Sequence, residues 1–157
     1  EDMVSEVFVS PPLVAVFPRR HVLASRRSIR LEDLTGEAFV PFPTSIHSRL
    51  LEIIVATCAD AGFAPYVAQE AHHLHTVLAL VDAGVGVTLA PPWVAHARAM
   101  DIAYVPAGNS TRTYDLVFVR RHDSTNIALK RLWTAATAKQ CAPTWGLDRN
   151  ELTPERT

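Results

Sequence analysis

The amino-acid sequence predicts an α/β fold with a mostly parallel sheet flanked by helices. Between residues 39 and 106, short apolar, β-rich runs alternate with segments whose apolar side chains recur at helical spacing. This alternation is typical of a parallel sheet covered on both faces. Residues 85–89 (VGVTL) are almost wholly apolar, as expected of a strand buried on both sides. The composition agrees, since 48% of the 157 residues are hydrophobic and 20% are charged, as in ordinary globular proteins.

Two strands and a turn are predicted near the start of the chain. Residues 13–17 (LVAVF) form an apolar run between two prolines, which predicts a buried strand. Residues 31–34 predict a helical turn before Gly36. Residues 39–42 (FVPF) predict the second strand. Because Pro41 has no N–H to donate to a neighbouring strand, this strand is expected at an edge of the sheet or to end early.

Helices and strands then follow one another. The predicted helices span residues 46–61, 74–81 and 92–98, and the predicted strands span residues 66–69, 85–89 and 102–105. Gly62 and Gly84 follow the first two helices, and glycine suits the left-handed residue that ends a helix. Pro92 suits the first turn of the third helix, where its missing N–H costs nothing.

The last part of the chain predicts one strand, one helix and a tail. Residues 114–120 (YDLVFVR) are the longest strand candidate. Residues 127–138 predict a helix, with Asp123 or Ser124 as the expected N-cap because short polar side chains are favoured there. Residues 139–157 carry prolines and charges without periodicity and are expected to form a tail.

Charge and cysteine usage exclude several classes of function. The net charge is −1, so the chain offers no general attraction to nucleic acid or anionic membranes. No apolar run approaches the ~20 residues that span a bilayer. Cys58 and Cys141 are far apart and neither belongs to a CxxC pair. A disulfide framework or a zinc site is therefore not expected, and a reducing cytoplasm fits.

The sequence offers no set of residues for catalysis. The two glycines of Gly84-Val85-Gly86 resemble the start of a dinucleotide-binding motif, but they follow a predicted helix and Leu89 replaces the third glycine. We interpret them as a helix stop and a tight entry into the next strand. There is no GxSxG motif, and no carboxylate pair stands in a context suited to acid–base chemistry. We predict that the chain is not an enzyme and binds no cofactor.

Three histidines, His72, His73 and His75, cluster at the start of the second predicted helix, close to Glu70. The spacing of His72 and His75 places both on one helix face, where they could bind a metal. No third ligand is evident nearby, so we predict no metal site. The alternatives are an exposed polar turn and an imidazole that lines a pocket.

Thr44 and Ser45 lie between the end of a predicted strand and the start of a helix. Open α/β sheets bind ligands at such places, and the first turn of a helix has free N–H groups that attract anions. The hydroxyls could cap the helix or contact a ligand. Ser45, next to Ile46, is the better cap candidate, and Thr44 is the freer hydroxyl.

The order of these segments resembles the effector-binding region of LysR-type transcriptional regulators. Residues 21–24 (HVLA) match a His-Pro-Leu-Ala-like segment of that family, with Val22 in place of proline. Residues 81–91 (VDAGVGVTLAP) match its pattern of a helix end, a glycine pair and a strand that ends in proline. The resemblance covers roughly residues 13–138.

The resemblance implies a type II periplasmic-binding-protein-like fold, in which two α/β lobes enclose a small effector. Residues 10–111 would form lobe II, residues 1–9 and 112–138 would be fragments of lobe I, and residues 139–157 would be the C-terminal tail. The family's winged helix-turn-helix and most of lobe I have no counterpart here. We therefore expect operator binding only through that absent N-terminal part, and an exposed apolar face where the rest of lobe I would pack.

The resemblance also implies a ligand site on two segments. The implied ligand-binding residues are Thr44, Ser45, His47, Ser48 and Leu50 in the first segment and His73, His75 and Thr76 in the second. Members of the family often bind small carboxylates or aromatic acids, which suits two helix N-termini that face one cleft.

We therefore predict the effector-sensing domain of a cytoplasmic bacterial regulator that modulates transcription as a homo-oligomer. A solute-binding protein of a transport system is the alternative, although the chain begins with Glu1-Asp2 rather than with a signal pattern. A transferase or hydrolase with a similar lobe is the second alternative. It would need a catalytic constellation that the sequence does not show.

Overall fold

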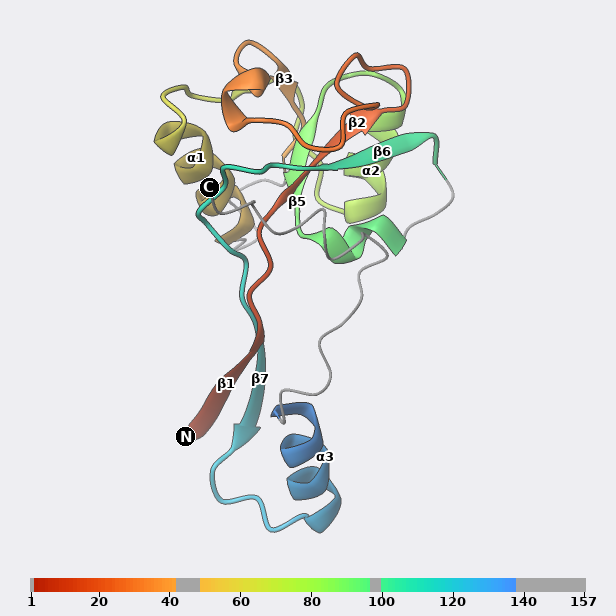
Figure 1. Ribbon diagram of the computed structural model, residues 1–157. Coiled ribbons are helices and arrows are strands. Elements are labelled where there is room, and N and C mark those ends of the chain that lie inside the picture. The colour runs from red at the N-terminus through yellow and green to blue at the C-terminus, as the bar shows by residue number, and fades with distance from the viewer. Residues whose placement is uncertain (1, 42–48, 97–99, 138–157) are drawn as a thin grey trace.

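The computed structural model describes residues 2–41, 49–96 and 100–137. Figure 1 shows a globular body from which an arm extends. The arm consists of strand β1 (Met3–Val9), strand β7 (Leu116–Arg121) and helix α3 (Ile127–Thr137). All the other elements belong to the body. In the described residues, no helix is both long and apolar enough to cross a membrane.

The centre of the body is strand β2 (Val14–Pro18), all of whose residues are buried. It lies between β5 (Thr88–Ala90) and β6 (Ile102–Pro106). Residues 13, 15 and 17 point into one hydrophobic cluster and Val16 into another, because successive side chains of a strand face opposite sides. This burial on both faces explains why the run at residues 13–17 has no polar alternation.

The predicted mostly parallel sheet is not what the structure shows. β2 pairs antiparallel with β5 and with β6, so β5 and β6 run in the same direction on either side of an opposed strand. Within the part of the chain that the structure describes, β3 (Ala38–Phe39) and β4 (Tyr66–Val67) are the only two strands that pair in parallel. An apolar strand that is buried on both faces has the same pattern in either direction, so its sequence does not reveal the direction of pairing.

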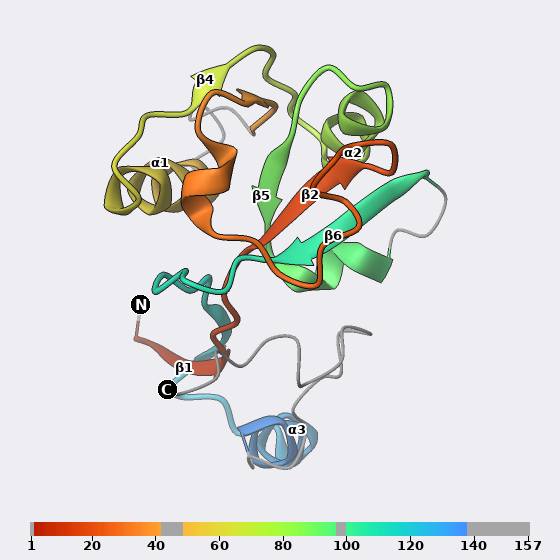
Figure 2. The ribbon, with the colours of Figure 1, turned by 45° about the horizontal axis from the view of Figure 1, so that its top comes forward.

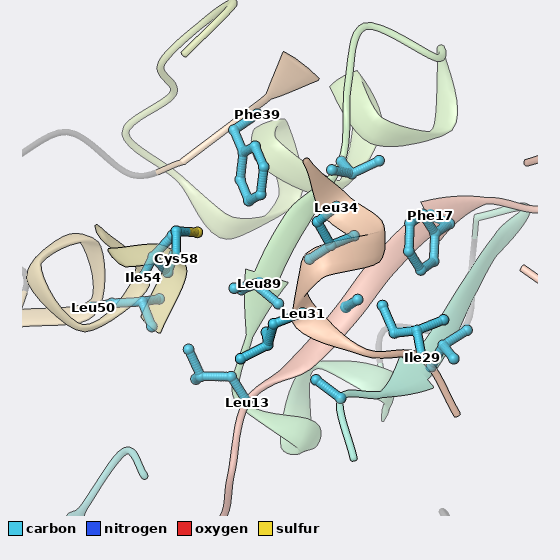
Figure 3. Packing of buried hydrophobic residues seen from close by; sticks show 14 residues of the cluster. Leu13, Phe17, Ile29, Leu31, Leu34, Phe39, Leu50, Ile54, Cys58 and Leu89 are labelled. Atoms are coloured by element: carbon cyan, nitrogen blue, oxygen red, sulfur yellow. The ribbon is translucent and has the colours of Figure 1, made fainter. Parts of the chain in front are cut away.

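Helices cover both faces of these strands. Helix α1 (Arg49–Asp60) and the 3-10 turn η1 (Leu31–Leu34) pack into the first cluster, and helix α2 (Leu74–Asp82) packs into the second. Figure 2 shows α1 and α2 on opposite sides of β2 and β5. In Figure 3 the side chains from α1, η1 and the strands converge in the first cluster. The predicted layered α/β arrangement is therefore confirmed.

Most of the predicted elements are present within the described residues. The turn at residues 31–34 and the helix at residues 74–81 are confirmed. Gly62 and Gly84 both have positive φ, at 83° and 81°, as predicted for residues that end helices. β3 belongs to a two-stranded sheet and ends at Phe39, two residues before Pro41, so the strand ends early, as predicted.

The helix predicted to begin at Pro92 is present as a 3-10 helix, η3 (Pro92–His96). One local prediction was wrong. The N-cap of α3 is Asn126 and not Asp123 or Ser124, because its Oδ1 accepts hydrogen bonds from the N–H groups of Ala128 and Leu129 at 2.9 and 3.2 Å. Any of these three short polar residues suits an N-cap. Asn126 is the cap because the helix begins at the next residue, Ile127.

The arm packs on one side only. Phe8 contacts Phe118 edge-on with ring centroids 4.9 Å apart, and Phe118 lies next to Trp133 of α3. Seven large apolar side chains of the arm are exposed. They are Met3, Val7, Leu116, Val117, Val119, Ile127 and Leu132. Exposed apolar side chains are therefore present on the arm, and that they lie where the rest of lobe I would pack stays a prediction.

Candidate functional site

The segments that leave β3 and β4 lie next to each other at one edge of the sheet. The N–H of Ala68 donates to the carbonyl of Phe39 at 2.9 Å, and the N–H of Ala71 donates to the carbonyl of Pro41 at 3.4 Å. The chain therefore enters residues 42–48 and helix α2 from neighbouring strand ends. This is the edge at which parallel strands present ligand sites.

Helix α2 begins at this edge without a side-chain cap. His73 is its N-cap, with extended backbone angles and no side-chain hydrogen bond that caps the turn. Its carbonyl accepts from the N–H groups of Thr76 and Val77, both at 3.0 Å. The N–H groups of the first turn point away from the helix, and they and the helix dipole favour negative charge there.

An open pocket of about 650 Å³ lies beside this helix, within the range of about 300–1,000 Å³ that is usual for small-molecule sites. Its described lining consists of Gln69, Glu70, Ala71, His72, His73, Thr76, Leu80 and Val85. Most of the lining surface is apolar. The pocket therefore combines a mostly apolar wall with five polar residues, namely Gln69, Glu70, His72, His73 and Thr76.

Glu70 limits what this pocket can hold. Glu70 belongs to the same lining as His72 and His73, and its negative charge disfavours a ligand that carries several negative charges. A neutral or singly charged organic molecule is compatible with this wall, with its charge placed near the start of α2.

The structure brings together part of the predicted site. His73 and Thr76 both line the pocket, whereas the exposed His75 lies outside its described lining. Leu50 is buried with 7% of its surface exposed and packs in the core cluster shown in Figure 3. Four predicted residues lie outside the described residues. These are Thr44, Ser45, His47 and Ser48.

Several lining residues were not predicted from the sequence. Leu80 follows Thr76 by four positions, so helical spacing places the two on one face. Val85 follows Gly84, whose positive φ turns the chain back toward the helix, and the N–H of Val85 donates to the carbonyl of Leu80 at 3.0 Å. Helical spacing alone could have identified Leu80, but the contribution of Val85 depends on how the chain turns.

Two observations on the described residues concern metal binding and thiol reactivity. These residues contain no cluster of three His, Cys, Asp or Glu side chains able to hold a metal ion. Cys58 is buried in the core, and burial raises the pKa of its thiol to about 11. The reactive thiolate is therefore scarce at neutral pH.

The sequence matches a family model described as "LysR substrate binding domain" over residues 1–141. It is 35% identical over 129 residues to the HTH-type transcriptional regulator CatR of Pseudomonas putida, covering 82% of this chain and 44% of CatR. It is 38% identical over 90 residues to the transcriptional dual regulator GltC of Bacillus subtilis (strain 168), covering 57% of this chain and 29% of GltC. The chain thus spans less than half the length of these relatives.

Solved structures share the fold. CbnR, a LysR family transcriptional regulator, superposes with a TM-score of 0.76 at 19% identity, over 85% of this chain and 46% of CbnR. The effector-binding domain of BenM with its effector benzoate superposes with a TM-score of 0.72 at 18% identity, over 91% of this chain and 68% of that domain. The effector-binding domain of QuiR in complex with shikimate gives 0.69 at 19% identity, over 87% of this chain and 64% of that domain. At these identities the likeness shows the periplasmic-binding-protein-like fold.

Proposed function

Because the chain belongs to the LysR substrate-binding domain family, we propose that it senses a small-molecule effector for a LysR-type transcriptional regulator. The observation that carries the proposal is the pocket at the start of α2, at the strand edge where residues 42–48 also begin. In the proposed division, residues 10–111 form lobe II, and residues 1–9 and 112–138 belong to lobe I. The effector binds on the face of lobe II that carries this pocket.

The proposed effector is a small organic acid or aromatic compound with at most one negative charge. The N–H groups at the start of α2 favour its carboxylate, the apolar wall favours a ring, and Glu70 disfavours a second negative charge. Benzoate and shikimate, bound by BenM and QuiR, are both cyclic monocarboxylates, which supports this class. They serve here as probes.

The proposed contacts come from two segments. His73 and Thr76 contact the effector from α2, and His75 lies on the adjacent flank of that helix. Thr44, Ser45, His47 and Ser48 contact it from the segment before α1. Leu50 supports that segment from the core. The effector acts through its different affinity for two arrangements of the intact regulator.

The whole regulator is proposed to bind operator DNA through a part outside this chain and to act as a homo-oligomer in the cytoplasm. CbnR has been solved at full length with its target DNA, which supports a DNA-bound regulator. The relatives named above are transcriptional regulators, and this favours a regulator over an enzyme or a solute-binding protein of a transport system.

Thermal-shift and calorimetric titrations of the chain with benzoate and shikimate test the proposal. Stabilisation should reach about 2.7 kcal/mol at a ligand concentration 100 times Kd. Thr76→Val should weaken binding about fivefold if it removes a hydrogen bond worth about 1 kcal/mol. His73→Ala should weaken it as well.

The matched controls are Thr35→Val and His122→Ala, at exposed positions away from the pocket. They should leave the affinity unchanged. The proposed contacts would be excluded if the probes bound as tightly as they do to the wild-type chain in Thr76→Val, in His73→Ala and in the double variant Thr44→Ala with Ser45→Ala. Absence of binding for both probes and for a wider set of monocarboxylates would exclude the ligand class.

A further inference from the structure

Two chain segments join the body to the arm, and they pair with each other. Pro12 forms an antiparallel bridge with Thr113, and the N–H of Tyr114 donates to the carbonyl of Pro11 at 3.0 Å. Figure 1 shows the two segments side by side where they leave the body. Since they are hydrogen-bonded to each other, they form one ribbon, and its attachment to the body sets the direction of the arm.

The two segments are attached to the body in different ways. The first enters the core directly, because Leu13 is only 1% exposed. The second is held by Tyr114, which packs against the first cluster and edge-on against Trp93 with ring centroids 5.6 Å apart, and by polar contacts that come before it in the chain. Asn109 accepts from the N–H of Leu31 at 2.9 Å and donates to Glu32 at 2.9 Å. Three residues further on, Arg112 contacts Asp60 in α1.

The contact between Arg112 and Asp60 is bidentate. Nε of Arg112 lies 2.6 Å from Oδ2 of Asp60, and Nη2 lies 3.0 Å from Oδ1. Such a paired contact fixes the relative orientation of two side chains better than a single hydrogen bond does. Arg112 lies four residues before β7 begins, so the contact holds the ribbon close to its exit from the body.

Asp60 is poorly placed for helix stability. It is the last residue of α1, where the negative end of the helix dipole disfavours a carboxylate. The hydrogen bonds from Arg112 lower the pKa of Asp60 below its usual range. The contact with Arg112 therefore stabilises a carboxylate that the helix end alone would destabilise.

We propose that the Asp60–Arg112 ion pair is a latch that positions the arm relative to the body. Both side chains are nearly half exposed, at 45% and 44%, and exposed ion pairs are weak. The latch can therefore open without unfolding the body. Arg112 and Asp60 act as positioning residues.

The latch also connects the arm to the proposed ligand site. Helix α1 begins at Arg49, directly after residues 42–48, and ends at Asp60. A small rotation of this helix when a ligand binds at its start would move Asp60 against Arg112. This role in regulation rests on the proposed function, whereas the positioning role rests only on the contact geometry.

The test measures the distance between body and arm in the whole chain. Spin labels are attached to Val22→Cys and Leu132→Cys, both at exposed positions, in a chain that also carries Cys141→Ser; the buried Cys58 stays unlabelled. Asp60→Asn or Arg112→Gln should broaden the distance distribution by about twofold, because two arrangements become populated. The charge-swapped double variant, Asp60→Arg with Arg112→Asp, should narrow it again.

Arg19→Gln is the matched control, because Arg19 and Asp101 form another exposed Arg–Asp pair that does not touch the ribbon. It should leave the distribution unchanged. Unchanged distributions in both latch variants would overturn the proposal, and so would broadening that the charge swap does not reverse. The measurement needs no ligand, so it can succeed or fail independently of the benzoate and shikimate titrations. Benzoate or shikimate, whichever binds, should shift the distance distribution of the labelled chain that keeps Asp60 and Arg112. An unshifted distance distribution would limit the latch to its positioning role.

Discussion

Gly86 lies so close to Ala38 that a Cβ atom on Gly86 would collide with the carbonyl group of Ala38. That same carbonyl accepts a hydrogen bond from the N–H of Val87 at 2.7 Å, and the N–H of Val40 donates to the carbonyl of Val87 at 2.8 Å. The glycine therefore allows β3 to approach the segment that leads into β5. This close contact agrees with the tight entry into the next strand that the sequence predicts at the glycine pair.

Gly86→Ala should lower the free energy of unfolding by about 1–3 kcal/mol, because the added methyl group must push two backbone segments apart. Urea denaturation monitored by circular dichroism measures this change. Gly36→Ala gives the cost of backbone strain alone, because its Cβ would meet open space but its φ of 85° is strained for alanine, at about 1–2 kcal/mol. Gly86 has no positive φ, so without the contact to Ala38 an alanine there would stabilise the chain by about 0.4–1 kcal/mol. A more stable Gly86→Ala variant would therefore contradict the close contact.

Cys58 should resist thiol reagents in the folded protein. Burial raises the pKa of its thiol to about 11, so the thiol stays protonated near pH 8 and lacks access to the reagent. In a Cys141→Ser background, Ellman's reagent at pH 8 should react only after urea is added. Rapid reaction in the native state would contradict the burial of this side chain.

The raised pKa of Cys58 also predicts a pH dependence. Because the folded-state pKa of about 11 lies above the ordinary thiol value of 9.0, this thiol's contribution to stability is present below pH 9 and is lost as the pH rises toward 11. The wild-type chain should therefore lose more stability over that interval than Cys58→Ala does. Parallel loss in the two proteins would show that other groups cause the pH dependence.

Asn126→Ala should destabilise helix α3 by about 1 kcal/mol, because the side chain caps two N–H groups of its first turn. Faster hydrogen exchange in residues 127–131 and weaker helical circular dichroism measure this loss. Thr125→Ala alters the neighbouring exposed residue and should change neither signal. Equal exchange in the two variants would argue against Asn126 as the cap.

The exposed face of the arm should make the chain self-associate at high concentration. Val117 and Val119 are 45% and 53% exposed and lie on the same side of β7, opposite Val7 and Ser5. Val117→Lys with Val119→Lys should lower the apparent mass in light scattering at high concentration, since charges on an exposed strand oppose association. Val22→Lys, at a 76% exposed position on the body, should not. If both variants had the same apparent mass at high concentration, the surface that self-associates would lie outside the exposed face of the arm.

The sequence predicts the elements better than their arrangement. Residues 13–17, the helix that ends before Gly84 and the final helix were all identified from apolar spacing and glycines, because local periodicity follows directly from helix and strand geometry. The antiparallel pairing of β2 was missed, since a strand buried on both faces carries no sign of its direction. The cap of α3 was missed because Asp123, Ser124 and Asn126 suit that role equally well.

The candidate site was also predicted only in part from the sequence. Its location at the end of β3 and the start of α2 could be inferred from the order of segments and from the resemblance to a known family. His73 and Thr76 were among the predicted residues, and both line the pocket. Leu50 satisfies the helical pattern but points into the core, and spacing alone cannot tell the inner face of a helix end from its outer face.

The sequence by itself determined the family, the order of helices and strands, and the glycines that end two helices, because these depend on local backbone chemistry and on motif order. Only the tertiary structure decided which way β2 pairs, that Val85 returns to line the pocket with Thr76, and that Asp60 meets Arg112 across 52 positions of the chain. The physical reason is that such contacts depend on how separate segments pack together, and no local pattern records that packing.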